Sequence, residues 1–181
     1  ERAIAASAIV VCQNEIPLEC NLAALQIAKH AGVRTIYNPA PAADIPAELL
    51  RLTDILVPNE TEAAFLAGLP TDTDESAAQA AQAAQALRQR GPRAVILTLG
   101  RRGALVLDAA ALTHIPAASV QAIDTTGAGD AFVGSLAYYL ALGDDLRSAV
   151  QKSCLIATQS VLRPGTQCSF PYPHELPEAC R

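Results

Sequence analysis

The chain has 181 residues, a formal net charge of −5 and 51% hydrophobic residues. This apolar content excludes an intrinsically disordered chain. The acidic balance, without a basic run, argues against nucleic acid or an anionic membrane as a partner. The length fits one domain with a substantial core, and without a run of about 18 apolar residues we expect no membrane-spanning helix.

Two features of the composition bear on processing and compartment. Methionine is absent and the chain opens with Glu1, so we expect a processed chain or a fragment of a longer protein. The five irregularly spaced cysteines favour a cytoplasmic protein. Because no C-x-x-C pair occurs, we do not expect a zinc ribbon or a thioredoxin-type site. Cys12 and Cys154 lie in apolar segments, where we expect small core residues.

In the first half of the chain, short apolar runs alternate with helical patterns. We expect buried strands over 8–12, 33–37 and 55–57, with a helix between the first two that ends at Gly32. A short helix over 59–67 has Asn59 as its N-cap and ends at Gly68. Asp72 and Glu75 have capping-box spacing before a solvated alanine–glutamine helix over 77–90.

In the second half, the clearest buried strand covers 94–99. Residues 100–103 turn the chain into a strand over 104–108, with 112–115 beside it, and helices over 127–142 and 145–163 follow. This alternation predicts an α/β fold with a mostly parallel sheet covered on both faces. The last two strands are too close together for crossover connections, so they should form an antiparallel edge.

Residues 124–132 read DTTGAGDAF and open a long apolar helix. The small residues Gly127, Ala128 and Gly129 leave the first N–H groups of the helix unobstructed, which favours an anion site. Asp130 stands where that site ends. Its carboxylate would repel a phosphate ligand, but it could take a proton from an attacking hydroxyl during phosphoryl transfer.

On the local pattern alone, other interpretations stay open. The same residues fit a capped helix behind a glycine turn, with Asp130 solvated. A dinucleotide fingerprint is weaker, because Phe132 stands where a third glycine is needed. A Walker A loop is weaker too, because neither Lys29 nor Lys152 follows a glycine.

The sequence DTTGAGDAF resembles the C-terminal signature of the ribokinase-like (PfkB) carbohydrate kinases. NPAPA at 38–42, NETE at 59–62, TLGRRG at 98–103 and GTQCS at 165–169 occur in the order that this family shows. The resemblance covers nearly the whole chain. It implies a three-layer ribokinase-like α/β fold with a mostly parallel central sheet, from which the N-terminal strands and the β-lid are missing. Residues 1–181 would then be the C-terminal, ATP-binding and catalytic part of a single domain.

The resemblance also implies an activity: ATP-dependent phosphorylation of D-ribose at its 5-hydroxyl, with Mg²⁺ and a monovalent cation, K⁺, as cofactors. NPAPA together with the GTQ segment favours ribose over the substrates of sibling kinases. Two alternatives are another sugar or nucleoside kinase of the family and a non-catalytic nucleotide-binding fragment. The full-length parent is expected to be a homodimer formed through the missing lid. We expect it in the cytoplasm, with the nucleus as an alternative compartment.

The family pattern assigns roles to individual residues. Asp130 would be the base that deprotonates the sugar hydroxyl, and the Gly127-Ala128-Gly129 backbone would form the anion hole. Glu15 matches a sugar-contacting glutamate. Asn59 and Glu62 would act near the triphosphate and Mg²⁺, largely through water. The nucleotide would lie along Thr98, Leu99, Gly100, Arg101, Arg102, Gly103, Gly129, Asp130 and Cys154.

Local interpretations stand beside these roles. Asn59 and Glu62 also fit ordinary helix capping. The 98–103 segment also fits a simple turn, and Glu15 also fits an exposed loop carboxylate. Position 154 departs from the family, which has Asn or His where this chain has Cys154. The residues at positions matching the monovalent-cation site, several of them acting through backbone carbonyls, are Asp124, Thr126, Ser160, Arg163, Gly165 and Ser169.

Overall fold

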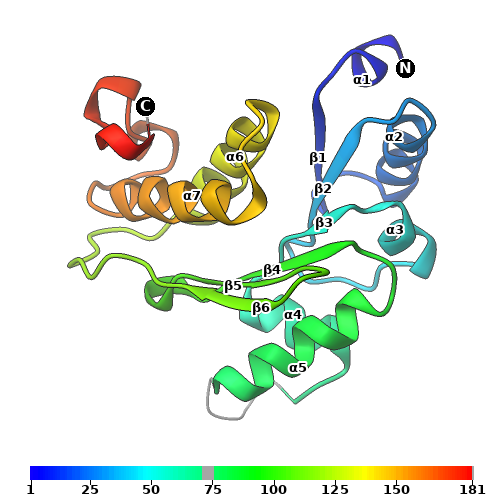
Figure 1. The fold of residues 1–181 in the computed structure, drawn as a ribbon, viewed down its shortest axis with the longest axis horizontal. Coiled ribbons are helices and arrows are strands. Elements are labelled where there is room, and N and C mark those ends of the chain that lie inside the picture. Colours follow the sequence, from blue (N-terminus) through cyan, green and yellow to red (C-terminus); the bar gives the residue numbers. More distant parts are fainter. Residues whose placement is uncertain (71–75, 181) are drawn as a thin grey trace. The chain divides into compact units, whose positions relative to one another are not determined.

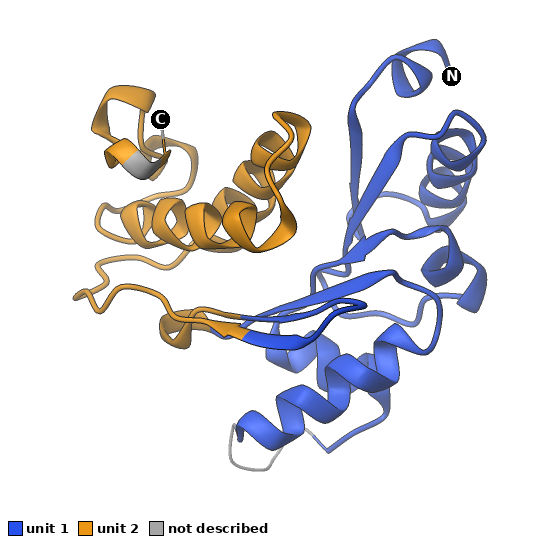
Figure 2. Cartoon of the chain, viewed as in Figure 1, with its two compact units in different colours: residues 1–99, 105–113 blue, residues 100–104, 114–181 orange. Residues whose placement is uncertain are grey.

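The computed structural model describes residues 1–70 and 76–180. They form two compact units, Glu1–Leu99 with Leu105–Thr113 and Gly100–Ala104 with His114–Arg181 (Figure 2). The predicted capping box of Asp72 and Glu75 lies outside the described residues. In the described part of the chain, no helix combines the length and apolar character needed to cross a membrane.

A six-stranded sheet, with its strands side by side in chain order, organises the first unit (Figure 1). Its first four strands pair in parallel, as predicted, with Val11 opposite Ile36 and Ile36 opposite Ile55. The connection between the last two strands is closed by a hydrogen bond from Asp108 N–H to the Ala111 carbonyl (3.2 Å), and its shortness requires an antiparallel pair. The sheet is therefore mixed. The strands are β1 (Ile9–Gln13), β2 (Arg34–Asn38), β3 (Ile55–Leu56), β4 (Ala94–Thr98), β5 (Ala104–Leu107) and β6 (Leu112–Ile115).

The helices that connect the parallel strands pack on one face of the sheet. The strand order advances in one direction and parallel crossovers are right-handed, so each connection returns over the same face. Tyr37, Leu56 and Val95 are in register on this face and share a buried core with Leu25 and Leu49 from the helices. The helices of this unit are α1 (Arg2–Ala5), α2 (Leu18–His30), α3 (Ala47–Leu52), α4 (Glu60–Ala67) and α5 (Ala77–Arg88).

The alanine–glutamine helix differs from its prediction. We expected a solvated helix, but one stripe of α5 is buried: Ala80, Ala83, Ala84 and Leu87. These positions follow the i, i+3, i+4, i+7 pattern of a helix face that packs on a core. Because alanine occupies most positions of this segment, the composition does not show which face of the helix is buried. The glutamines lie at other positions of the helix.

The second unit is built on two long helices that pack against each other, α6 (Ala128–Ala141) and α7 (Leu146–Ser160). Asp145 caps α7 by accepting from the N–H groups of Arg147 (3.0 Å) and Ser148 (3.1 Å). Short 3-10 turns follow α7 or precede β5. They are η1 (Gly100–Arg102), η2 (Gln167–Ser169), η3 (Pro173–Glu175) and η4 (Glu178–Cys180).

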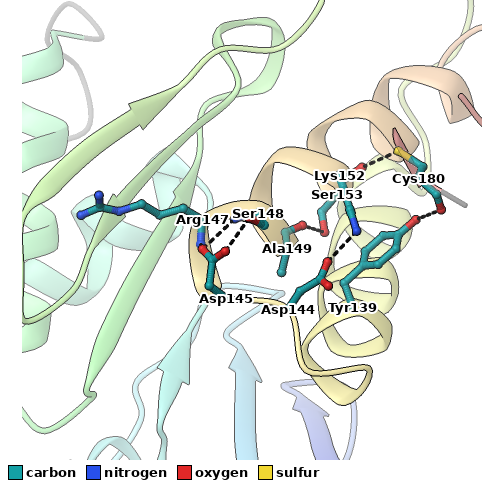
Figure 3. A network of polar contacts seen from close by, with 9 residues as sticks. All are labelled: Tyr139, Asp144, Asp145, Arg147, Ser148, Ala149, Lys152, Ser153 and Cys180. Carbon is teal, nitrogen blue, oxygen red and sulfur yellow. Dashed lines mark hydrogen bonds and ion pairs between the residues drawn. The ribbon is translucent and has the colours of Figure 1, made fainter. Parts of the chain in front are cut away.

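A polar network fastens the end of the chain to this helix pair (Figure 3). Lys152 Nζ lies 2.7 Å from an Asp144 carboxylate oxygen and 4.7 Å from the centre of the Tyr139 ring. The Tyr139 hydroxyl donates to the Cys180 carbonyl (2.6 Å), and burial raises the pKa of Tyr139 to about 12. This hydroxyl therefore stays a donor across the physiological pH range, and η4 remains attached to α6 and α7.

Candidate active site

Four polar residues follow the four parallel strands of the first unit. Glu15 comes two residues after β1, Asn38 ends β2, Asn59 comes three residues after β3, and Thr98 ends β4. The carboxyl ends of parallel strands meet at one edge of a sheet, which is the edge where α/β folds bind ligands. An isolated bridge between Asn59 and Thr98 brings two of the predicted nucleotide residues together. Glu15 is exposed at the same edge.

Asn59 and Glu62 form a complete capping box at the start of α4, as the local interpretation predicts. Asn59 Oδ1 accepts from Glu62 N–H (2.8 Å), and the two Glu62 carboxylate oxygens accept from Asn59 N–H (2.9 Å) and Asn59 Nδ2 (2.8 Å). Burial raises the pKa of Glu62, and the hydrogen bond from the Asn59 backbone partly opposes that shift. The pair is thus a fixed acidic feature at the edge of the sheet.

The predicted nucleotide segment after β4 passes from one unit into the other. Thr98 N–H donates to the Pro58 carbonyl (3.0 Å), and Leu99 is buried. In the second unit Gly100 has a φ of 53° and begins η1, with Arg101 exposed. Gly103 has a φ of 92°, and a side chain there would collide with the Ile115 carbonyl and Ala117 N, so this position requires glycine.

The DTTGAGDAF segment forms the predicted glycine turn and helix start. Gly127 is the N-cap of α6 in the left-handed conformation, with a φ of 79°. An added Cβ there would lie 3.3 Å from Phe170 Cε1 and 3.4 Å from Thr166 Cα, so the loop after α7 packs directly on this turn. Ala128 N–H donates to the Thr125 carbonyl (3.2 Å). Gly129 and Asp130 are exposed in the first turn of the helix, whose N-terminus favours negative charge.

Asp124 joins the turn before α6 to the loop after α7. One carboxylate oxygen accepts from Thr126 Oγ1 (2.6 Å) and Thr126 N–H (2.9 Å), and the other accepts from Gly165 N–H (2.8 Å). The bond from the Thr126 hydroxyl is the main cause that lowers the pKa of Asp124 to about 2, followed by the N–H groups of Gly165 and Thr126. Asp124 therefore links two others of the six predicted cation-site residues, Thr126 and Gly165.

The other three residues of that set lie close along the chain. Ser160 and Ser169 are buried, with hydroxyls that donate to the Ala157 (2.9 Å) and Thr166 (2.7 Å) carbonyls. Val161, next to Ser160, accepts from the N–H groups of Ile123 and Asp124. The Arg163 side chain is held by Glu175 through contacts of 2.5 and 3.3 Å, a pairing that the sequence analysis missed. Arg163 could serve a cation only through its carbonyl oxygen.

The resemblance implies two cofactors, a monovalent cation and Mg²⁺. A monovalent cation needs oxygen ligands beside an ionised carboxylate; Asp124 supplies such a carboxylate, with Thr126 Oγ1 next to it, and both carboxylate oxygens already accept hydrogen bonds. Mg²⁺ keeps several of its waters and is held through one or two carboxylates. Glu62 fits such a role through water, because Asn59 already occupies both of its oxygens.

Cys154 lies in α7 and is buried, as expected for a small core residue. Burial raises the pKa of its thiol to about 11, so the side chain is neutral at physiological pH. All five cysteines, each within the described part of the chain, are free.

A cluster of amide side chains beside Glu15 was not predicted from the sequence. Asn14, Asn21 and Asn38 are linked through Gln13, Tyr37 and the loop at Pro39. The signal that could have found them is the polar Gln13-Asn14 pair directly after an apolar strand, at the edge where ligands bind.

Comparison with known proteins identifies the family to which this mixed α/β chain belongs. The model of the pfkB family of carbohydrate kinases matches residues 2–173, so the chain belongs to that family.

Individual relatives refine this assignment. The chain is 41% identical to a ribokinase of Mus musculus over 181 residues, covering 97% of this chain and 55% of the relative. It is 38% identical to a deoxyribokinase of Salmonella typhimurium, covering 90% of this chain and 53% of the relative. A structure of Arabidopsis thaliana ribokinase complexed with ribose and ATP superposes with a TM-score of 0.85 at 32% identity, covering 94% of this chain and 55% of that one. The chain thus spans about half the length of these relatives.

Proposed function

We propose that this chain supplies the ATP-binding and catalytic part of a kinase that transfers the γ-phosphoryl group of ATP to the 5-hydroxyl of D-ribose. The observation that carries the proposal is Asp130, an exposed carboxylate in the first turn of a helix that begins at a left-handed glycine. The relatedness to ribokinases, one of them solved with ribose and ATP, supports ribose and ATP as the substrates.

In the proposed mechanism the residues of the second unit act on the reacting atoms. The Asp130 carboxylate accepts the proton of the attacking hydroxyl, which makes that oxygen a better nucleophile. The backbone N–H groups of Gly127 and Gly129 at the start of α6 stabilise the charge of the transferring phosphoryl group, and Ala128 N–H would join them on leaving the Thr125 carbonyl. Asp124 and its partners hold this helix start against the loop after α7, where K⁺ would bind.

A second set of residues binds and orients the substrates. Glu15 contacts the sugar, while Thr98, Leu99 and the 100–103 turn lie along the nucleotide, with Cys154 near the base. Asn59 and Glu62 hold the water shell of Mg²⁺, which when bound neutralises charge on the triphosphate. A homodimer formed through a lid, and a cytoplasmic or nuclear location, are further parts of this proposal.

The decisive experiment replaces Asp130 by Asn. The protein is assayed alone and joined to the portion of mouse ribokinase that it does not match. We expect kcat for ribose to fall by about 10²–10⁴ because the base is lost, while ATP binding is unchanged. Asp44→Asn, an exposed loop carboxylate of the first unit, is the control that removes the same charge. Near-normal turnover by the Asp130→Asn variant would refute the role of Asp130.

A second candidate is a kinase for a related sugar, favoured by the similarity to a deoxyribokinase. A panel of ribose, 2-deoxyribose, fructose and nucleosides decides between them through kcat/KM. Preference for 2-deoxyribose would replace ribose in the proposal while leaving the role of Asp130 intact.

A further inference from the structure

A cluster of amide side chains lies at the carboxyl ends of β1 and β2, and none of the roles proposed above uses it. Gln13 and Asn38 are opposite each other at the ends of the two strands. Asn14 and Glu15 follow Gln13 directly, so the cluster adjoins the residue proposed to contact the sugar. All of these residues belong to the first unit.

Asn14 binds the loop that follows β2 through both its backbone and its side chain. Its N–H donates to the Ala40 carbonyl (2.9 Å), and its Nδ2 donates to the carbonyls of Pro39 (3.2 Å) and Pro41 (2.9 Å). Its Oδ1 accepts from the hydroxyl of Tyr37, which is fully buried in β2. One asparagine therefore holds three successive carbonyls of the neighbouring loop.

Gln13 is held from two other directions. Asn21, fully buried in α2, donates from Nδ2 to the Gln13 carbonyl (2.7 Å). The Gln13 side chain donates to Asn38 Oδ1 (3.1 Å), and Asn38 Nδ2 donates to the Val57 carbonyl after β3 (2.7 Å). The segment before Glu15 is thus tied to the loops after β2 and β3.

Stability alone does not account for this cluster. The Asn21 Oδ1 atom is buried and has no hydrogen-bond partner. An unsatisfied buried amide oxygen is unfavourable compared with an apolar side chain of similar size. What the amides provide is a fixed conformation of a ligand-facing loop, and a loop that is already ordered loses less entropy when it binds.

We propose that Asn14 is a positioning residue for sugar binding, which fixes the loop that carries Glu15 to the loop at Pro39–Pro41. This inference rests on the proposed function, because Glu15 contacts the sugar only if the protein is a sugar kinase. Asn14 acts through Glu15, and it needs no contact with the sugar itself.

Three variants separate positioning from simple loss of stability. Asn14→Leu removes the bonds to Pro39, Pro41 and Tyr37, and leaves the buried Tyr37 hydroxyl without its acceptor. Tyr37→Phe removes only that hydroxyl. The double variant Asn14→Leu/Tyr37→Phe has no buried Tyr37 hydroxyl without an acceptor, so its melting temperature should recover towards the wild-type value. It still lacks the hydrogen bonds from Asn14 to the Pro39 and Pro41 carbonyls.

The readout is steady-state kinetics in the polypeptide that phosphorylates ribose. For Asn14→Leu and the double variant we expect KM for ribose to rise about tenfold, with KM for ATP and kcat within about twofold of wild type. Gln26→Leu is the matched control, because it removes another hydrogen bond of an amide side chain between two elements, away from these loops. In the wild type, Gln26 Nε2 donates to Glu48 Oε1 (2.9 Å). This control should leave both KM values unchanged.

Hydrogen exchange gives a second measurement on this chain that does not need turnover. The amide protons of Asn14 and Glu15 should exchange faster in Asn14→Leu and in the double variant, but not in Gln26→Leu. Unchanged exchange would overturn the inference. A wild-type KM for ribose in the double variant would also overturn it and leave the proposed function standing. Lack of ribose turnover by the joined polypeptide with the wild-type sequence would instead defeat the proposed function.

Discussion

At the residue scale, Asp124 shows how one carboxylate can organise the glycine turn before α6. Its two oxygens accept three hydrogen bonds from Thr126 and Gly165, although 41 positions separate Asp124 from Gly165. Donors aimed at an ionised carboxylate stabilise the charged form, which is why the pKa of this group falls to about 2. The Gly127 turn therefore depends on a charge that is absent only in strong acid.

This linkage predicts a pH dependence of stability. The pKa of Asp124 is lower in the folded than in the unfolded chain, so its contribution is complete above about pH 4 and is lost as the pH falls towards 2. The difference in melting temperature between wild type and Asp124→Asn should therefore be largest above pH 4 and shrink below it. A difference that stays constant from pH 7 to pH 2 would contradict the assignment.

At the scale of single elements, α4 combines a structural cap with a proposed binding role. Glu62 is only 5% exposed, and both its oxygens depend on Asn59. An ordinary N-cap contributes about 1 kcal/mol to stability. Removing the Asn59 side chain also takes one hydrogen-bond donor from the buried Glu62 carboxylate, which destabilises the fold more than the loss of a cap alone.

Asn59→Ala should consequently lower the free energy of unfolding by about 2 kcal/mol or more. Ser76→Ala, at the N-cap of α5, is the comparison, since Ser76 accepts a single exposed hydrogen bond from Gln79 N–H (3.1 Å). It should cost at most about 1 kcal/mol. Denaturant unfolding measures both, and equal losses would show that the buried carboxylate adds nothing.

Among the strands that the structure describes, β1 has one neighbour and carries an apolar side chain that is partly exposed. Val11 is 40% exposed, and β1 pairs only with β2 among the strands described. An open apolar edge invites pairing with other chains, and a lysine on such an edge opposes it. Val11→Lys should therefore reduce light scattering of the heated protein without lowering its melting temperature. Val57→Lys, at a buried position, should instead destabilise the protein.

At the scale of the whole molecule, the chain spans about half the length of its relatives, so nucleotide binding and turnover can be separated experimentally. Binding ATP to the folded state raises stability by mass action, about 2.7 kcal/mol when its concentration is 100 times Kd. Turnover also requires a held sugar and a site from which water is excluded.

ATP should therefore raise the melting temperature of the chain in a concentration-dependent way, while ribose-dependent ADP release requires the joined polypeptide. An ADP-release assay and a thermal melt on the same samples measure both. ATP binding without ribose-dependent ADP release in either form would favour the non-catalytic alternative. A lack of ATP stabilisation would contradict both interpretations.

The sequence by itself determined the features that depend on near neighbours. The capping box at Asn59, the glycine that ends α4, the strands and the glycine turn before α6 all use contacts within a few residues or a regular apolar period, so the pattern predicted them. The same motifs predicted the family. The buried face of α5 was not predicted, because alanine occupies most positions of that segment.

The tertiary structure alone decided the contacts that join distant segments. Asn14 meets Tyr37 across 23 residues, Arg163 is paired with Glu175, and Asp124 reaches Gly165. No local period encodes these pairs, because they depend on which strands lie side by side and how the loops at their ends pack. The motifs therefore predicted the residues of the candidate site, and the folded chain decided which of them contact one another.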